Sequence, residues 1–336
     1  MIGLSQELIT NNIFYDGHNR EYTIYIPQTY SSLNSEPILF AFHGGGGYSD
    51  DFMNYEADLR PIADTAGFIL VYPQALEDPN NENNSTSWLH KDPTDHKDIF
   101  FIETLIDTIA SNYNVDLSRI YACGYSLGGM FAYELACQLN NKITSIVAVA
   151  GAAFYGAFAY CELTHPTPIL SISGTNDVEH PYNDTNGWYF PVSEINNYWA
   201  TSNNTDPTPL IEELPNIDLS DGSSVERYSW INGDGCVSVE ELKIINGGHD
   251  WPSPLSPWSN QDINANSEIW NFVSKYNMDG LIGCDDLSVK VKDIADERKL
   301  LKIINIVGQE VNSTMNKGGI LFYIYRDGTV QKKINF

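Results

Sequence analysis

Short, continuously apolar segments that alternate with helix-type segments are the feature that most limits how this chain of 336 residues can fold. A strand that is apolar on both faces must be covered on both faces, and helices between such strands make the connections parallel. We therefore expect a doubly wound, mostly parallel α/β sheet, preceded by a hairpin. The predicted strands are Leu8–Phe14, Glu21–Pro27, Ile38–Phe42, Phe68–Tyr72, Arg119–Gly124, Ile143–Ala150, Ile169–Ser173 and Leu242–Asn246, and the predicted helices are Asp51–Ala66, Asp98–Tyr113, Leu127–Leu139, Val192–Thr201 and Ile263–Tyr276.

The charge of the chain is strongly negative and unevenly distributed. Asp and Glu number 44 against 18 Lys and Arg, a formal net charge of −26. A field of this sign repels nucleic-acid backbones and anionic membrane surfaces, so neither is expected as a partner. No apolar run of 18 residues occurs, so no transmembrane segment is predicted either. Residues 285–336 hold nine basic and seven acidic residues. This break predicts two domains, 1–284 and 285–336.

The second predicted domain has a β-type pattern with little helix. Strands are predicted at Leu300–Val307, Ile320–Tyr325 and Val330–Phe336, with a hairpin turn at Asp327–Gly328. A segment of this length holds little core of its own, so we expect a small β module.

The strongest chemical signal is the sequence Gly124-Tyr125-Ser126-Leu127-Gly128, which lies between a predicted strand and a predicted helix. In that context a G-x-S-x-G motif forms a sharp turn that holds the serine hydroxyl above the sheet. Only small neighbours avoid collision in such a turn. We therefore predict that Ser126 is a nucleophile and that the Leu127 N–H contributes to an oxyanion hole.

A glycine run follows another predicted strand, at His43-Gly44-Gly45-Gly46-Gly47. Glycines here let the backbone approach a substrate carbonyl, so the Gly45 N–H is the expected second oxyanion donor, with Gly44 as the alternative. No Lys-Ser/Thr pair follows, which argues against a phosphate-binding loop. We expect His43 to brace this loop rather than to act as the base.

A serine nucleophile needs a base, and the base needs an orienting carboxylate. In a sheet of this kind the base comes last in chain order. His249 follows the predicted strand Leu242–Asn246 and fits best among seven histidines. Asp177 follows the strand Ile169–Ser173, where ligands bind at the carboxyl end. Asp184 and Asp250 are the alternatives for the acid.

Three aromatic residues are candidate substrate-binding walls. Tyr125 precedes Ser126, Trp251 follows His249 by two residues, and Trp88 is the third candidate. No metal site is predicted, because the five cysteines lack metal-ligand spacing. A segment resembling a calcium loop begins with Trp230, which cannot coordinate calcium, so a turn between two strands is expected there.

At these residues the chain resembles the polyhydroxybutyrate-depolymerase and feruloyl-esterase-like family of α/β-hydrolases. The matching stretches are HGGGG at 43–47, FILVYPQAL at 68–76, SRIYACGYSLGGMFAYELAC at 118–137, VAVAGA at 147–152, SGTNDVEHPYN at 173–183 and GGHDWP at 247–252. The resemblance covers roughly residues 10–278. It implies a secreted serine ester hydrolase with Ser126, Asp177 and His249 as the triad, and it suggests a disulfide between Cys137 and Cys161.

Two positions depart from the pattern of this family. The family often has Asn where this chain has Leu127, and Val where it has His180. Both positions lie near the expected pocket, so they affect the inference about substrate rather than the inference about chemistry.

The last segment resembles the C-terminal sorting domain of type IX secretion substrates in Bacteroidetes-type bacteria. The matching residues are LLKIINIVGQEV at 300–311 and LFYIYRDGTVQKKI at 321–334. This resemblance implies the type IX secretion machinery as a partner and a secreted or cell-surface location, although no signal peptide is visible at the N-terminus. A generic β appendage or a carbohydrate-binding module is the alternative.

The sequence thus predicts a cofactor-free ester hydrolase that acts through an acyl-enzyme. A polyester, either a polyhydroxyalkanoate or an aromatic polyester such as polyethylene terephthalate, is the first expectation for the substrate. The alternative is a feruloyl or acetyl ester on a plant or algal polysaccharide. An alternative of another class is a surface glycan-binding protein without catalysis, although every triad position holds a competent residue.

Overall fold

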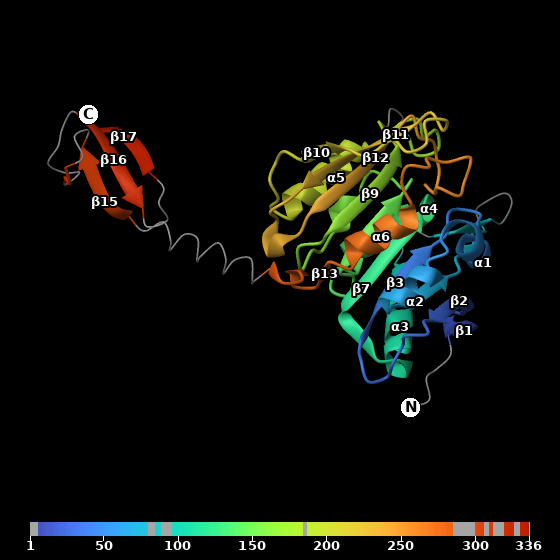
Figure 1. Cartoon of the computed structure of the whole chain (residues 1–336). Coiled ribbons are helices and arrows are strands. Elements are labelled where there is room, and N and C mark those ends of the chain that lie inside the picture. The colour runs from blue at the N-terminus through green and yellow to red at the C-terminus, as the bar shows by residue number, and fades with distance from the viewer. Residues whose placement is uncertain are drawn as a thin grey trace. The chain divides into compact units, whose positions relative to one another are not determined.

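A computed structural model gives the fold of the chain, which forms two compact units, Met1–Ile282 and Gly283–Phe336 (Figure 1). The structure describes residues 6–79, 85–88, 96–183, 187–284, 300–305, 309–311, 319–325 and 330–335. The division between the units falls within three residues of the predicted break in charge.

The larger unit is built on a ten-stranded sheet with a parallel centre. Neighbouring strands from β4 through β12 pair in parallel, whereas the outer strands at both edges pair antiparallel. This confirms the predicted doubly wound, mostly parallel sheet of an α/β-hydrolase fold. In spatial order the strands are β1 (Glu7–Tyr15), β2 (His18–Ile26), β4 (Ile69–Pro73), β3 (Glu36–Phe42), β7 (Val115–Tyr125), β8 (Ser145–Val149), β9 (Ile169–Gly174), β12 (Val239–Ile245), β11 (Ser224–Trp230) and β10 (Leu210–Glu213).

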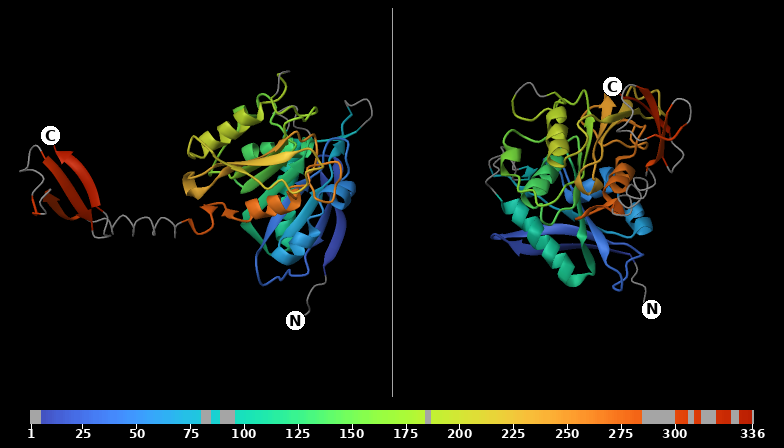
Figure 2. Two further views of the ribbon diagram at one scale, coloured as in Figure 1. Left: turned by 45° about the horizontal axis from the view of Figure 1, so that its top comes forward. Right: turned by 90° about the vertical axis from the view of Figure 1, so that its left-hand side faces the viewer.

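Helices cover both faces of this sheet, as the two views of Figure 2 show. Successive side chains of a strand point to opposite faces, so Phe40 and Phe42 of β3 join one core cluster and Leu39 and Ala41 join the other. The first cluster includes residues of α3 (Lys97–Asn112), α4 (Leu127–Gln138) and α5 (Val192–Ser202). The second includes residues of α2 (Arg60–Ala66) and α6 (Ala265–Val273). The continuous apolar runs in the strands are therefore explained by burial on two sides.

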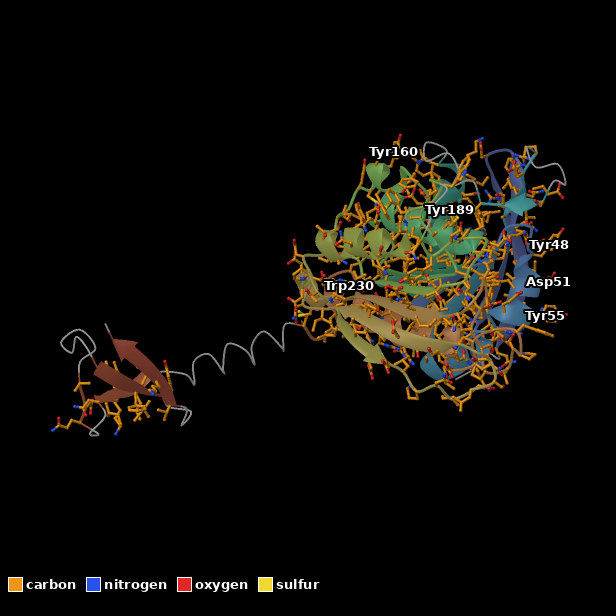
Figure 3. All side chains as sticks on the ribbon, turned by 90° about the horizontal axis from the view of Figure 1, so that it is seen from above. Tyr48, Asp51, Tyr55, Tyr160, Tyr189 and Trp230 are labelled. Atoms are coloured by element: carbon orange, nitrogen blue, oxygen red, sulfur yellow. A yellow bond between two sulfur atoms is a disulfide. The ribbon has the colours of Figure 1, made fainter. Side chains whose placement is uncertain are left out.

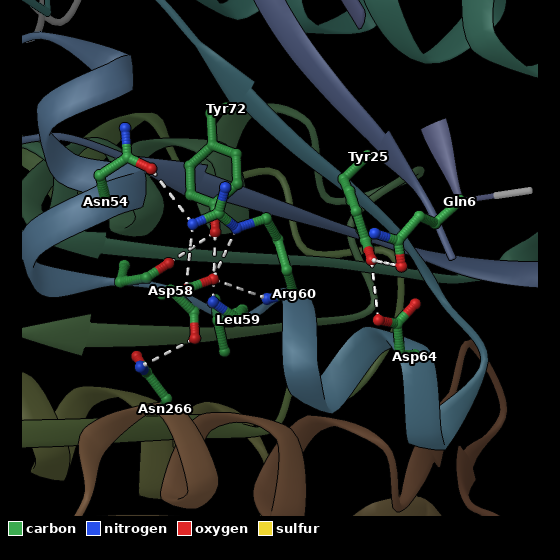
Figure 4. Close-up of polar contacts among 10 residues, drawn as sticks. Gln6, Tyr25, Asn54, Asp58, Leu59, Arg60, Asp64, Tyr72 and Asn266 are labelled. Atoms are coloured by element: carbon green, nitrogen blue, oxygen red, sulfur yellow. Dashed lines mark hydrogen bonds and ion pairs between the residues drawn. The ribbon is translucent and has the colours of Figure 1, made fainter. Parts of the chain in front are cut away.

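The single helix predicted over Asp51–Ala66 is wrong, because the chain forms α1 (Ser49–Asp51), a π-helical turn η1 (Phe52–Glu56) and then α2. In one continuous helix Pro61 would clash with the carbonyl of Ala57 and could not donate to it. That carbonyl instead accepts from the Tyr72 hydroxyl at 2.5 Å and from the Leu59 N–H at 2.9 Å. Figure 4 shows this break, where the Arg60 guanidinium also binds the Asp58 carboxylate at 2.7 Å.

The larger unit also contains disulfide-bonded cysteines and several short elements. Cys137 and Cys161 form the disulfide that the family resemblance implies. Cys236 is also disulfide-bonded, and Cys123 is a buried free thiol. The short elements are β5 (Leu76–Glu77), β6 (Thr86–Ser87), η2 (Ala157–Tyr160), η3 (Asp234–Cys236), β13 (Tyr276–Asn277) and β14 (Gly280–Leu281).

The smaller unit contains a three-stranded antiparallel sheet in the order β15 (Leu300–Asn305), β16 (Gly319–Tyr325) and β17 (Val330–Asn335). These strands agree with the three predicted from the sequence, whereas the predicted turn at Asp327–Gly328 lies outside the described residues. Among the helices that the structure describes, none combines the length and the hydropathy needed to cross a bilayer.

Candidate active site

Four loops at the carboxyl edge of the parallel strands bring the predicted site residues together. His43 follows β3, Ser126 follows β7, Asp177 comes three residues after β9, and His249 comes four residues after β12. Parallel strands end at the same edge of a sheet, so residues far apart in sequence meet there. This topology explains why the chain order serine, aspartate, histidine produces one site.

Ser126 sits in a strained turn between β7 and α4. Its φ and ψ are 52° and −119°, values that an L-residue adopts only when the surroundings impose them. A Cβ added to Gly124 would lie 2.2 Å from the backbone of Gly128, and one added to Gly128 would lie 2.2 Å from the carbonyl oxygen of Phe42. The two glycines therefore allow the turn, which places Ser126 at the N-terminus of α4.

The three predicted triad residues form one hydrogen-bonded chain. Nε2 of His249 lies 2.8 Å from Oγ of Ser126, and Nδ1 of His249 lies 2.7 Å from Oδ2 of Asp177. Because the carboxylate only accepts, Nδ1 carries the proton and Nε2 is free to accept one from the serine hydroxyl. The arrangement has the geometry that a serine nucleophile with a histidine base requires.

The Asp177 carboxylate is held in place by its own loop. Its Oδ1 accepts from the backbone N–H groups of Glu179 at 2.9 Å and His180 at 2.8 Å, which leaves Oδ2 for His249. The residue is buried, so these bonds replace its lost hydration. Of the two alternative acids, Asp250 accepts from the backbone of Gly248, and Asp184 lies outside the described residues.

The glycine loop lies against the start of α4. A Cβ added to Gly45 would approach Cδ2 of Leu127 within 3.1 Å. The N–H groups of Gly46 and Gly47 are already bonded, to the carbonyls of Thr86 and Gly44. The N–H of Leu127 begins a helix and has no acceptor within it. The N–H groups of Leu127 and Gly45, with Gly44 as the alternative to Gly45, thus remain the candidates for binding an oxyanion, aided by the positive end of α4.

His43 is buried beneath this loop and holds it, as the sequence analysis expects. Its Nε2 accepts from the Ala75 N–H at 3.1 Å, and its Nδ1 donates to the Gly44 carbonyl at 2.7 Å. Burial lowers the pKa of His43 to about 4, so the imidazole is neutral at physiological pH. A further residue, Gln74, was not predicted from the sequence. Its side-chain amide contacts Nε2 of His43 at 3.2 Å and also accepts from the Ser49 N–H.

Trp88 belongs to the core and is not a substrate-binding wall, contrary to the prediction. Its side chain is fully buried and stacks on Phe131 with ring centroids 4.9 Å apart. Its Nε1–H donates to the His43 carbonyl at 2.9 Å. The prediction failed because the sequence does not show whether an aromatic residue lines a pocket or packs in the core.

A pocket of about 400 Å³ opens beside the glycine loop and is lined by Tyr125 together with residues of α1 and η1. Tyr125 thus lies where a substrate wall is predicted, and its hydroxyl donates to the His249 carbonyl at 2.7 Å. Two carboxylates, Asp51 and Glu56, face the same pocket, and burial together with the charge of Asp51 raises the pKa of Glu56. Figure 3 shows Tyr48 and Asp51 on one side of the unit, next to Tyr55.

Trp251 supports the pocket from behind rather than lining it. Its side chain is 6% exposed and packs edge to face on Phe52, with ring centroids 5.3 Å apart. Its Nε1–H donates to Asn266 at 3.1 Å. Direct contact of Trp251 with a substrate is therefore not supported, although Phe52, the ring on which it packs, lines the pocket.

The calcium-like segment that begins at Trp230 connects the strands β11 and β12, as predicted, and its connection includes the short helix η3. Its polar side chains are used within the protein, since Asn232 donates to Asp206 at 2.7 Å and Asp234 accepts from Asn204 at 2.6 Å. Over the part of the chain that the structure describes, no group of three or more His, Cys, Asp or Glu side chains is arranged to hold a metal ion.

Comparisons with known proteins place the larger unit in a family. The model of the family Esterase, described as "Putative esterase", matches residues 15–225, more than half of the chain. The chain is 28% identical over 267 residues to a bifunctional acetylxylan esterase/xylanase of Neocallimastix patriciarum, covering 79% of this chain and 34% of that protein. It is 22% identical over 282 residues to feruloyl esterase D of Neurospora crassa, covering 81% of this chain and 86% of that protein.

Solved structures agree with the fold. An acetyl xylan esterase from Aspergillus awamori superposes with a TM-score of 0.57 at 17% identity, covering 80% of this chain and 99% of that one. A ferulic acid esterase from Anaeromyces mucronatus superposes with a TM-score of 0.52 at 16% identity, covering 84% and 94%. With the family match, these likenesses show that the chain belongs to the Esterase family of ester hydrolases, on an α/β-hydrolase fold.

Proposed function

We propose that this protein is a serine carboxylic-ester hydrolase that removes acyl groups from an ester-substituted polysaccharide. The observation that carries the chemistry is the unbroken chain of hydrogen bonds from Asp177 through His249 to Ser126. The named relatives that act on acetyl and feruloyl esters support the choice of substrate class.

In the proposed reaction the Ser126 hydroxyl attacks the ester carbonyl while Nε2 of His249 takes its proton. The oxyanion that forms accepts hydrogen bonds from the Leu127 and Gly45 N–H groups. When the C–O bond of the ester breaks, His249 returns the proton to the leaving alcohol, and the acyl group stays on Ser126. A water molecule, deprotonated by the same histidine, then releases the carboxylic acid.

A polyester is the second candidate substrate, and exposed apolar side chains that follow triad residues in sequence favour it. Val178 follows Asp177 directly and is 82% exposed. Leu255 and Trp258 lie in the segment after His249 and are 91% and 87% exposed. Apolar groups displayed in this way would adsorb to the surface of a hydrophobic polymer.

The experiment that tests the proposal compares product release from acetylated xylan, feruloylated arabinoxylan and an amorphous polyester film, measured by chromatography. We expect acetate or ferulate from the polysaccharides, and loss of all turnover in Ser126→Ala but not in Ser111→Ala, an exposed serine on α3. Products from the film alone would instead support the polyester. An active Ser126→Ala variant would refute the assignment of the nucleophile.

Covalent labelling distinguishes an ester hydrolase from a non-catalytic glycan-binding protein. A fluorophosphonate probe should modify Ser126, because the base beside it activates the hydroxyl. A wild-type protein that binds glycans but neither reacts with the probe nor hydrolyses p-nitrophenyl acetate would favour this other class.

We also propose that the protein is exported, with the smaller unit as a sorting domain for type IX secretion. The three-stranded sheet and the resemblance of residues 300–311 and 321–334 support this role. The Cys137–Cys161 disulfide fits an oxidising location. In a bacterium with this secretion route, a chain ending at residue 284 should be retained by the cell while the full chain reaches the medium.

A further inference from the structure

A second and larger cavity, of about 850 Å³, lies beside the active site. Its walls come from the turn of the first hairpin, at Tyr15 and Asp16, and from the β5–β6 hairpin, at Glu77 and Thr86. We call this cavity the hairpin groove. Its size is within the range of cavities that bind organic ligands, and the catalytic chemistry does not use it.

The hairpin groove adjoins the pocket beside the glycine loop through one shared residue. Tyr48 lines both cavities. Thr86, in the wall of the groove, accepts from the Gly46 N–H at 2.7 Å and donates its hydroxyl hydrogen to the Gly47 carbonyl at 2.6 Å. A ligand in the groove would therefore contact Tyr48 and Thr86, the residues that connect the groove to the glycine loop.

The chemistry of the groove suits a neutral chain rich in hydroxyl groups. Tyr15 and Tyr48 offer aromatic faces with a polar tip, which pack on the C–H face of a sugar ring. Carboxylates accept hydrogen bonds from hydroxyl groups, and Asp16, Glu21 and Glu77 bring carboxylates to the described part of the groove. A polyester chain has no hydrogen-bond donor along its length, so it would give these carboxylates no hydrogen bond.

The charge of the groove opposes an anionic ligand. Its cations are Arg20 and Lys97. The Arg20 guanidinium is buried and bound to Asp98 at 2.6 Å, so its charge is already neutralised within the protein. The carboxylates of the groove therefore dominate its field, which disfavours uronic acids and phosphate esters.

We propose that the hairpin groove binds the neutral saccharide chain of the substrate and thereby positions its ester group over Ser126. This inference rests on the proposed hydrolysis of polysaccharide esters and adds a binding site for the polymer to it. Its consequence is that catalytic efficiency rises with the length of the saccharide that carries the ester.

Binding is tested on the full chain with the Ser126→Ala variant and xylohexaose, by isothermal titration calorimetry, with hexagalacturonate as the anionic counterpart. We expect xylohexaose to bind and hexagalacturonate not to bind. Adding Tyr15→Ala, or the paired isosteric changes Asp16→Asn and Glu77→Gln, should weaken xylohexaose binding about tenfold, the loss expected for one aromatic or polar contact. Equal binding of both sugars, or binding that these changes leave unaltered, would overturn the proposal.

Kinetics separate this inference from the proposed function. The ratio of kcat/KM for an acetylated xylohexaose to kcat/KM for p-nitrophenyl acetate should fall about tenfold in Tyr15→Ala. The matched control is Tyr160→Ala, a half-exposed tyrosine that Figure 3 shows away from Tyr48. An unchanged ratio in Tyr15→Ala would refute the groove alone, whereas a wild-type protein that hydrolyses neither ester would refute the proposed function.

Discussion

The imidazole rings of His180 and His249 meet nearly at right angles, with their centroids 5.1 Å apart. His180 is buried, and its Nδ1 donates to the carbonyl of Ala150 at 2.8 Å, while its own backbone N–H binds Asp177. One residue thus contacts both the base and the acid of the triad. Burial, and then the charge of His249, lower the pKa of His180, so it stays neutral beside the base.

His180→Val should lower kcat/KM for p-nitrophenyl acetate about tenfold, because contacting residues couple by about 1.4 kcal/mol. It should also reduce the free energy of unfolding by about 1–3 kcal/mol, because the buried carbonyl of Ala150 loses its donor. His180→Phe keeps a ring against His249 but cannot donate, so it should recover activity and not stability. Urea unfolding and steady-state kinetics measure the two effects, and equal behaviour of both variants would show that the ring contact has no role.

His43 should make the fold sensitive to acid. Its folded-state pKa of about 4 is below the value of 6.5 for an unfolded chain, so between these pH values only the unfolded chain binds the proton. The contribution of His43 to the free energy of unfolding is complete above pH 6.5. Acidification removes it, and the loss reaches about 3 kcal/mol at pH 4. Urea unfolding at pH 7.5, 5.5 and 4.5 checks this.

Replacement of His43 provides the control for that pH dependence. His43→Gln should lower the free energy of unfolding at pH 7.5 but flatten its decline toward pH 4.5. His18→Gln, at an exposed imidazole, should leave the decline as it is. A His43→Gln variant with the wild-type pH dependence would assign the acid sensitivity to other groups.

Glu134 should have the opposite effect, a loss of stability as the pH rises. Its side chain is buried in α4, where burial raises its pKa to about 8 although Gln138 donates to it. Below pH 4.5 the Glu134 carboxyl is protonated in both the folded and the unfolded chain. Between pH 4.5 and 8 only the unfolded chain loses this proton, so the free energy of unfolding falls over that range. Glu134→Gln should therefore raise the free energy of unfolding by about 3 kcal/mol at pH 7, and by little at pH 4.5. Thermal unfolding measures the effect, and Glu212→Gln, at an exposed position, is the control. The same dependence of stability on pH in both variants would contradict the prediction.

Trp88 should contribute to stability rather than to substrate affinity. Trp88→Ala removes a fully buried indole and should cost about 3–5 kcal/mol of unfolding free energy. Trp88→Phe keeps a ring beside Phe131 but loses the bond to the His43 carbonyl, at a cost of about 1–2 kcal/mol. Trp258→Ala, at an 87% exposed position, should change stability by less than about 0.5 kcal/mol. An altered KM with unchanged stability in Trp88→Ala would instead support the predicted contact of Trp88 with the substrate.

Local sequence was sufficient for the elements that build the site. The turn around Ser126 needs small residues at Gly124 and Gly128, because their Cβ atoms would collide with backbone, and this steric demand is visible in five consecutive residues. The order of Ser126, Asp177 and His249 along the chain, each after a predicted strand, was also readable, because parallel strands end at one edge.

Whether a side chain is buried or exposed was decided only by the tertiary structure. Trp251 follows His249 by two residues, and Trp88 is far in sequence from every site residue. Both are nevertheless buried, because Phe52 packs against Trp251 and Phe131 packs against Trp88. The hairpin groove joins residues from the first hairpin and from β5–β6, which no local pattern connects. Periodicity and motifs describe the neighbours of a residue along the chain, whereas burial, cavities and the contact of His180 with His249 depend on which distant segments pack together.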